Sequence, residues 1–162
     1  MKLSEGVEWA IHVCSLLAAL PPGKALSARR LAEYFALSVS YLAKVLQQLS
    51  AAGLVASRRG PGGGYGLARS PDEITLREIV EAIEGTSPCF RCTEIRRRGP
   101  TAVADDLFAR PCVIARTMWR AEEAWRAELA KVPLREIQMK GLAEMPAPQV
   151  EKAAQWLRAA LR

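Results

Sequence analysis

Two closely spaced amphipathic segments followed by a glycine-rich hairpin constrain this chain more than any other feature of its sequence. Residues 28–35 and 39–53 each place apolar residues at helical spacing, and only Ala36-Leu37-Ser38 separates them. Ser27 is of the type preferred at a helix N-cap, and Gly53 is of the type that ends a helix. Two helices joined by so short a turn predict a helix-turn-helix.

The hairpin follows directly. Residues 54–58 (LVASR) and 65–69 (YGLAR) are short strand-like runs, and RGPGGG between them is rich in residues that tolerate positive φ. A helix-turn-helix followed by such a hairpin is a winged helix. The hairpin would be its wing.

Two further helices flank this motif. Residues 4–20 repeat apolar residues at helical intervals and stop at Pro21-Pro22-Gly23, and a second helix begins after Thr75 and ends at Gly85. Together these segments predict a winged helix-turn-helix DNA-binding domain over residues 1–85.

The remaining residues predict a long loop and two helices. Residues 86–111 carry few apolar side chains, and so long a loop is usually functional or disordered. A long helix over 112–132 and an amphipathic helix over 149–161 follow, and together they make a unit of residues 112–162. The apolar stripe of the long helix exceeds what one small winged helix can cover, so we expect a homodimer; it contains Ile114, Met118, Ala121, Trp125 and Val132. The predicted fold class is mainly α, with a small β-hairpin wing and a long dimerisation helix.

The net charge of +6 is concentrated in the first part of the chain. Residues 1–70 hold 8 Lys and Arg against 3 Asp and Glu, whereas residues 71–162 hold 15 against 14. A basic excess confined to one unit indicates a polyanionic partner, and nucleic acid is the commonest one. A solvated basic face is the alternative.

In a helix-turn-helix the second helix enters the major groove, and polar residues near its N-terminus reach base edges. Wing residues can reach phosphates or a minor groove, and glycines let the backbone approach the duplex. Tyr41 and Tyr65 could instead be core aromatics, and the glycines could serve only the turn. The candidate DNA-binding residues are Ser38, Ser40, Tyr41, Lys44 and Gln47 on the helix, and Arg58, Arg59, Gly62, Gly63, Gly64 and Tyr65 in the wing.

Several classes of function are disfavoured. No apolar run approaches the roughly 20 residues that span a bilayer, and Glu5 and Glu8 lie where a signal peptide would be basic and then apolar. We therefore expect a cytoplasmic protein without a membrane partner.

The sequence has no phosphate-binding loop or nucleophile elbow, and its one histidine has no obvious catalytic partner. Neither an enzyme nor a small-molecule substrate is expected.

Four cysteines in a cytoplasmic chain are more often ligands, redox thiols or packing residues than disulfides. Cys89, Cys92 and Cys112 lie in or beside the loop, whereas Cys14 lies among apolar residues and is expected to pack in the core. The loop is rich in arginine, which favours the thiolate form that binds metals. Zinc held by the three loop cysteines and His12, or a thiol switch among those cysteines, remains an alternative.

Glu8 and His12 stand four residues apart on the first helix. Residues at this spacing share one face, so the two side chains could bind one metal ion. A carboxylate and an imidazole at this spacing are, taken alone, more often a surface pair.

The run from Leu26 to Gly85 resembles the signature of the Rrf-type (IscR/NsrR-like) bacterial transcriptional regulators, and the resemblance extends over about residues 1–85. It implies a winged-helix homodimer that binds partly palindromic operator DNA, with the long helices crossing at the interface. It also implies an iron–sulfur cluster held by cysteines of the loop, and a redox-sensing regulator that represses in one cluster state. Nineteen residues separate Cys92 from Cys112, a wider spacing than the commoner pattern of this family.

The cysteine spacing, with Glu8 and His12, resembles most closely the RsrR-type redox regulators of this family. That resemblance implies a 2Fe-2S cluster held by Glu8 and His12 of one subunit and by Cys92 and Cys112 of the other. Cys89 is the alternative to Cys92. Trp9 lies beside Glu8 and is the candidate for transmitting the cluster state, unless it is a static core residue.

Overall fold

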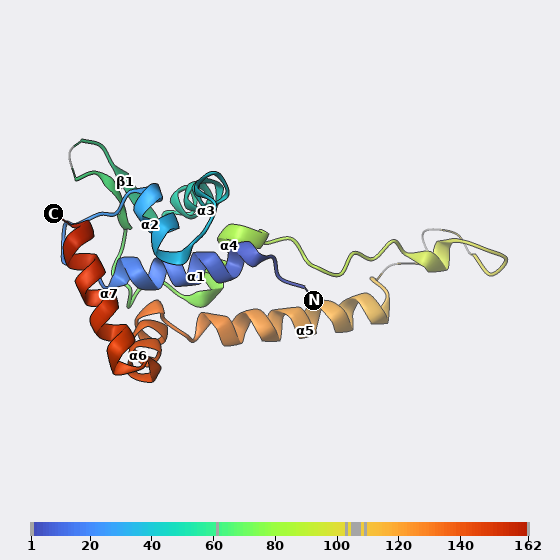
Figure 1. Cartoon of the computed structure of the whole chain (residues 1–162). Helices are drawn as coiled ribbons and strands as arrows, with labels where there is room; N and C mark the ends of the chain where they lie inside the picture. The colour runs from blue at the N-terminus through green and yellow to red at the C-terminus, as the bar shows by residue number, and fades with distance from the viewer. Residues whose placement is uncertain (1, 61, 103, 105–107, 109, 162) are drawn as a thin grey trace.

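The computed structural model describes residues 2–60, 62–102, 104, 108 and 110–161, so Pro61 of the wing and residues 103, 105–107 and 109 of the loop lie outside the described part. A helical body carries the hairpin, and α5 and the described residues of 86–111 extend from that body as an arm (Figure 1). The elements are α1 (Glu5–Ala18), α2 (Ala28–Phe35), α3 (Val39–Ala51), β1 (Val55–Arg58), β2 (Gly64–Leu67), α4 (Leu76–Glu84), the short 3-10 helix η1 (Ile95–Arg97), α5 (Val113–Ala130), α6 (Leu134–Glu144) and α7 (Ala147–Ala160).

The helix-turn-helix is confirmed. The Ser27 hydroxyl accepts a hydrogen bond from the Arg30 amide at 3.2 Å, which caps α2. Ala36 takes a left-handed conformation with φ of 53°, so the chain reverses into α3 within three residues. The inner faces of both helices are fully buried, and their core residues include Leu31, Leu42, Val45, Leu46 and Leu49. The alternative interpretation of Tyr41 as a core aromatic is wrong, because its side chain is 43% exposed.

The wing is a two-stranded antiparallel hairpin, with Val55 opposite Leu67 and Arg58 opposite Gly64. Its second strand is also held by the chain before α2, because Leu26 and Tyr65 exchange backbone hydrogen bonds of 3.0 and 2.8 Å. The base of the wing is therefore fixed to the helix-turn-helix.

Helix α4 joins this unit to the arm. Thr75 and Glu78 form the reciprocal capping box at its start, and Ser4 at the start of α1 donates two hydrogen bonds to Glu84 at its end. These bonds hold the pKa of Glu84 below its ordinary value. Gly6 lies where α1 and α4 pack closely, since a Cβ there would come within 3.2 Å of the Ile83 side chain.

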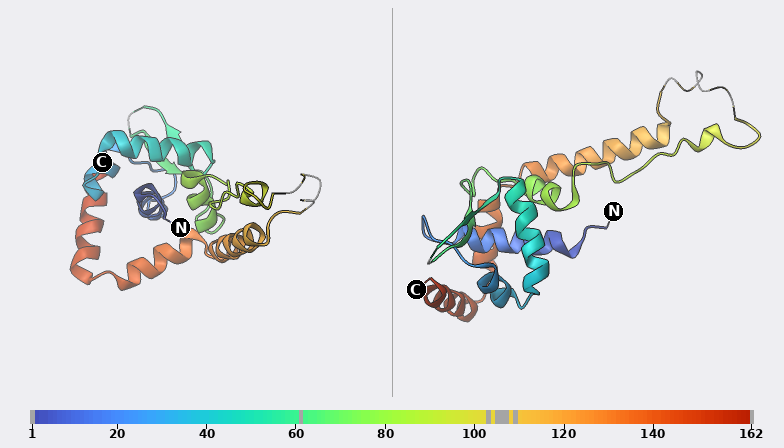
Figure 2. Two further views of the ribbon diagram at one scale, coloured as in Figure 1. Left: turned by 90° about the vertical axis from the view of Figure 1, so that its right-hand side faces the viewer. Right: turned by 90° about the horizontal axis from the view of Figure 1, so that it is seen from above.

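The C-terminal half of α5 is fixed to the body. The Leu76 amide donates to the carbonyl of Val132 at 3.0 Å, and the Leu134 amide donates to that of Ile74 at 2.8 Å. The 18 residues of α5 make it about 27 Å long. The chain between α4 and η1 runs beside the outer half of α5, and η1 lies beyond the N-terminal end of that helix (Figures 1 and 2). The fold class, mainly α with a small hairpin and a long helix, is confirmed.

The C-terminal segment differs from its prediction. The sequence predicted one helix over residues 149–161, whereas the structure has α6 as well, and α7 begins earlier, at Ala147. Helix α6 fully buries only Leu134, so its sequence lacks the apolar periodicity that identifies a helix. Trp156 of α7 packs edge-to-face on Tyr34 of α2, with ring centroids 4.9 Å apart. Among the described helices, none is long and apolar enough to cross a membrane.

Candidate DNA interface and metal-ligand residues

The polar residues predicted to read DNA share one exposed face at the start of α3. Ser38 precedes the helix, and its hydroxyl lies 3.0 Å from that of Ser40. All the predicted side chains of this face are exposed; they are Ser38, Ser40, Tyr41, Lys44 and Gln47. Leu42, Val45 and Leu46 anchor the opposite side of the helix in the core, so this face is displayed on a rigid support.

Tyr41 also touches the first helix. Its ring meets that of Trp9 edge-to-face, with centroids 4.8 Å apart and planes at 70°. The sequence pointed to each of these residues for a separate reason and gave no sign that they meet. The contact joins the candidate reading face to the helix that carries Glu8 and His12.

The wing residues divide into two groups. Arg59 is exposed near the tip, whereas Arg58 donates a hydrogen bond of 2.6 Å to the carbonyl of Gly23 and so braces the wing against the turn after α1. Tyr65 is partly buried against the core, as its alternative interpretation held.

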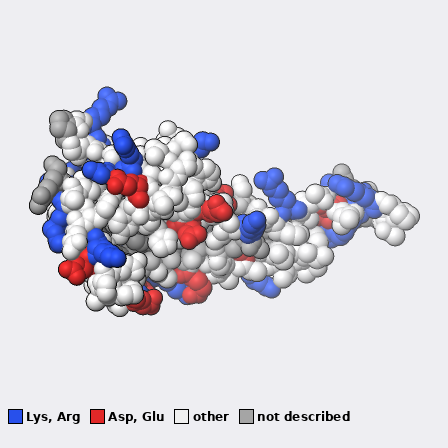
Figure 3. All heavy atoms as spheres, viewed as in Figure 1, with Lys and Arg blue, Asp and Glu red and all other residues white. Residues whose placement is uncertain are grey.

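The wing glycines have a reason within the fold. A Cβ on Gly64 would lie 2.3 Å from the backbone of Leu26, and one on Gly63 would lie 2.5 Å from the carbonyl of Arg58. Gly64 also has φ of 149°. These glycines therefore allow the wing to pack closely against the backbone of this chain. On the face seen in Figure 3, basic side chains gather over the wing and the outer arm, while acidic ones lie mostly over the middle.

Glu8 and His12 are both exposed on α1. They line an open hollow together with apolar neighbours, Leu3, Val7 and Ile11. The His12 ring lies 5.9 Å from that of Phe35 at the end of α2. Cys14 lies on the same helix, two residues after His12, and is fully buried. Burial raises the pKa of its thiol to about 12. Its predicted role as a packing residue is supported.

Cys92 and Cys112 share a basic neighbour. Cys112 is the N-cap of α5, and its amide donates to the carboxylate of Glu94, whose pKa is lowered chiefly by its ion pair with Arg96. The pKa of Arg96 is raised chiefly by the same ion pair. The charges of Cys112 and Cys92 also raise the pKa of Arg96. Arg96 therefore lies within electrostatic reach of both thiols, which are separated by nineteen residues in sequence.

Cys89 has different surroundings. Its amide donates to Glu122 of α5 at 2.9 Å. Desolvation, and then the charge of Glu122 and a hydrogen bond to it, raise the pKa of its thiol. Glu122 lies ten residues along α5 from Cys112, a rise of about 15 Å. The arm thus separates Cys89 from the Cys112 end of the helix.

The two groups of candidate ligands lie on different parts of the molecule, α1 in the body and the outer arm. Among the described residues of one chain, no three His, Cys, Asp or Glu side chains gather as metal ligands would.

The stripe of α5 predicted to pair with a second copy is exposed at its outer end. Ile114 is 62% exposed, and Val113 and Met118 are also largely exposed. The body does not cover them, because the ion pairs between α5 and α4 lie in the C-terminal half of α5, at Glu123 and Arg126.

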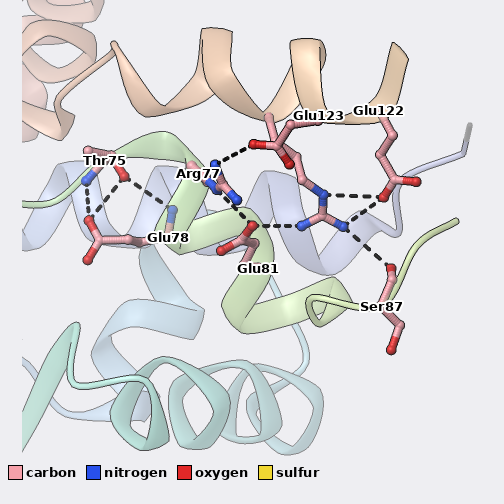
Figure 4. A network of polar contacts seen from close by, with 8 residues as sticks. Thr75, Arg77, Glu78, Glu81, Ser87, Glu122 and Glu123 are labelled. Atoms are coloured by element: carbon pink, nitrogen blue, oxygen red, sulfur yellow. Dashed lines mark hydrogen bonds and ion pairs between the residues drawn. The ribbon is translucent and has the colours of Figure 1, made fainter. Parts of the chain in front are cut away.

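One polar network, shown in Figure 4, was not predicted from the sequence. Arg126 is only 7% exposed and pairs with Glu81 of α4 at 2.7 Å and with Glu122 at 2.9 Å. Arg77 pairs with Glu81 at 2.9 Å and with Glu123 at 3.2 Å. The Arg126–Glu81 and Arg77–Glu123 pairs join residues that are 45 and 46 apart in sequence, so no local spacing marks these two pairs. Arg77–Glu81 and Arg126–Glu122 have the four-residue spacing of neighbours on a helix.

Comparison with known proteins gives a consistent result. Residues 3–140 match the model of the Rrf2 family, described as an iron-dependent transcriptional regulator. The regulator NsrR of Bacillus subtilis is 31% identical over 97 residues, which cover 60% of this chain and 66% of that protein. IscR of Aliivibrio salmonicida is 45% identical over 56 residues, 35% of this chain and 33% of that protein. The chain spans less than two thirds of the length of the curated relatives that it matches best.

Solved structures extend the likeness over most of the chain. CymR, the global cysteine regulator of B. subtilis, has a TM-score of 0.65 and 27% identity over 86% of this chain and 98% of that one. IscR of T. potens has a TM-score of 0.67, and the match covers 90% of this chain and 93% of that one. Its sequence identity is 24%, so this likeness shows a shared fold alone. These relatives are named as transcriptional regulators, in agreement with the prediction that the chain is not an enzyme. The closer likeness to RsrR-type regulators stays a prediction.

Proposed function

Because the chain belongs to the Rrf2 family of transcriptional regulators, we propose that it is a cytoplasmic homodimer that binds operator DNA under the control of a 2Fe-2S cluster. In this proposal residues 1–85 bind DNA, residues 86–111 carry the cluster loop, and residues 112–162 provide the dimerisation and C-terminal helices. The observation that carries it is the Trp9–Tyr41 contact, which joins the reading face of α3 to the helix of Glu8 and His12.

DNA binding is supported by the exposed polar face of α3 and by the basic wing beside it. A recognition helix reads base edges through side chains of its first turns, and Lys44 is the cation among them. Arg59 in the exposed tip of the wing has the chemistry for a phosphate. A dimer would present two such heads to a partly palindromic site.

Lys44→Ala and Arg59→Ala are expected to weaken binding in different ways. Loss of a base contact at Lys44 would cost about 1–3 kcal/mol on the preferred operator and relax the sequence preference there. Loss of a phosphate contact at Arg59 would weaken all duplexes alike and reduce the salt slope by about 1. Gel shifts over a salt series measure both effects. If neither variant changes binding to any genomic fragment, the assignment of these residues is wrong.

The cluster assignment is supported by the donor set. Thiolates, a carboxylate and an imidazole are all iron ligands, and Cys92 and Cys112 share the cationic neighbour Arg96. Glu8 and His12 of the partner subunit would complete the site, since one chain gathers only part of the set. The cluster would supply a reversible one-electron change. Zinc at the same residues would give a colourless protein without a redox titration, so an absorption spectrum of anaerobically purified protein separates the two.

Repression in one cluster state would then depend on α1. Glu8 and His12 would respond to the charge of the cluster, and Trp9 on the same helix touches the reading helix through Tyr41. A small shift of α1 would move the two reading heads relative to half-sites that lie one duplex turn apart.

Trp9→Ala is expected to leave the cluster in place and to remove the difference in DNA affinity between the oxidised and reduced protein, because the ring contact to Tyr41 is lost. Tyr41→Phe is the matched control, since it keeps the ring and removes only the hydroxyl. Gel shifts in both redox states give the two affinities. An undiminished difference in Trp9→Ala would show that the signal takes another route.

A further inference from the structure

Three side chains on one face of α5 are bonded to the backbone of the loop that leads to Cys92. The indole Nε1–H of Trp119 donates to the carbonyl of Phe90 at 3.0 Å. The Glu122 carboxylate accepts from the amide of Cys89 at 2.9 Å, and the guanidinium of Arg126 lies 3.5 Å from the carbonyl of Ser87.

The spacing of these contacts is regular. Trp119, Glu122 and Arg126 are three and four residues apart, which places them on one face of the helix. Their backbone partners occur in the reverse order, so residues 87–90 run antiparallel to α5. Three successive contacts fix both the direction and the register of the loop.

These side chains are themselves held in place. The side chains of Arg126 and Glu122 are only 8% and 10% exposed. One carboxylate oxygen of Glu122 accepts two hydrogen bonds from Arg126, and the other oxygen accepts the hydrogen bond from the Cys89 amide. The second branch of the Arg126 guanidinium bonds Glu81 of α4 at 2.7 Å. Figure 4 shows this fork between the two helices and Ser87. A fork of this kind is specific to arginine, whose planar group can serve several acceptors at once.

We propose that Trp119, Glu122 and Arg126 are positioning residues that hold residues 87–90 on α5 and thereby set Cys92 beside Cys112. The role of these residues in placing a cluster ligand rests on the proposed function. Their contacts with residues 87–90 are present in the chain without a cluster. Residues 87–92 are exposed or only partly buried, so these bonds offset the entropy of ordering them. Outer residues that orient metal ligands commonly change metal affinity by about 10- to 100-fold.

The test compares Trp119→Phe and Arg126→Met with Arg77→Met in the full-length protein. Trp119→Phe keeps an aromatic ring and removes only the N–H donor, and Arg126→Met removes the guanidinium. Arg77→Met is the matched control, because Arg77 belongs to the same network through Glu81 of α4 and Glu123 of α5, and neither of these partners belongs to the loop. Circular dichroism verifies that each variant is folded, and Trp119→Phe decides the question if Arg126→Met is not.

Two measurements are made. Hydrogen–deuterium exchange of the peptide containing residues 87–92, in the metal-free protein, is expected to be faster in Trp119→Phe and Arg126→Met and unchanged in Arg77→Met. After reconstitution with iron and sulfide, the first two variants are expected to lose the visible spectrum about 10- to 100-fold faster than the control. Exchange and cluster loss equal to those of Arg77→Met would overturn the proposal. A wild-type protein that takes up no cluster would contradict the proposed function, and the exchange measurement would still decide whether these residues hold the loop.

Discussion

Cys112→Ser and Cys92→Ser are each expected to yield a protein without the visible absorption of an iron–sulfur cluster. Each removes one of the two thiolates that we assign to the cluster, and a serine hydroxyl is a poor substitute for a soft sulfur ligand. Both thiols lie within electrostatic reach of Arg96, at the point where the loop meets the start of α5. Absorption spectra and iron and sulfide content of anaerobically purified variants measure the loss.

Two other cysteine variants are the controls. Cys14→Ser should retain the cluster, because this thiol is buried in the core. Cys89→Ser should also retain it, because Cys89 is engaged with Glu122, away from Cys112. Loss of the spectrum in Cys89→Ser, together with an unaffected His12→Ala, would mean a conventional three-cysteine cluster and would contradict the assignment.

Ile114→Glu is expected to convert the dimer to monomers at micromolar concentration. The side chain is 62% exposed in one chain and belongs to the apolar stripe that we assign to the interface, so a charge there would be buried without a partner. Substitution at the centre of an interface costs about 2 kcal/mol or more, which is about 30-fold in the dissociation constant. Sedimentation velocity over a concentration series measures the change.

Arg120→Glu is the control for the dimer, because Arg120 is exposed on another side of the same helix. We expect it to remain dimeric. If Ile114→Glu remains as dimeric as Arg120→Glu, the stripe of α5 is not the interface.

The parts of the fold that could be predicted are those with local causes. Ser27, Gly53 and Thr75 mark helix ends through side-chain caps or positive φ, and all three act as predicted. The wing was recognisable because its turn concentrates glycine between two strand-like runs. Tyr41 shows the limit of periodicity, since it lies at the edge of the apolar stripe, in the first turn of α3, where the body no longer covers it.

The parts that could not be predicted depend on contacts between distant segments. Trp119 bonds a backbone carbonyl 29 residues away and Arg58 bonds one 35 residues away, and a backbone carbonyl leaves no mark in a sequence. The same is true of the Trp9–Tyr41 contact, which sets two predicted residues side by side. For the candidate site, the residue types could be proposed from the sequence, but the different surroundings of Cys89 and Cys92 come from the fold of the arm.

The central claim is that each cluster is held by Glu8 and His12 of one subunit and by Cys92 and Cys112 of the other. The most direct measurement uses mixed dimers with two different affinity tags, in which one subunit carries Glu8→Ala and His12→Ala and the other carries Cys92→Ser and Cys112→Ser. Ligands shared across the interface leave one complete site in such a dimer, so we predict half the wild-type iron and visible absorption per dimer, with none in either variant alone. Mixed dimers without iron would contradict the account, because a site built within one subunit is broken in both.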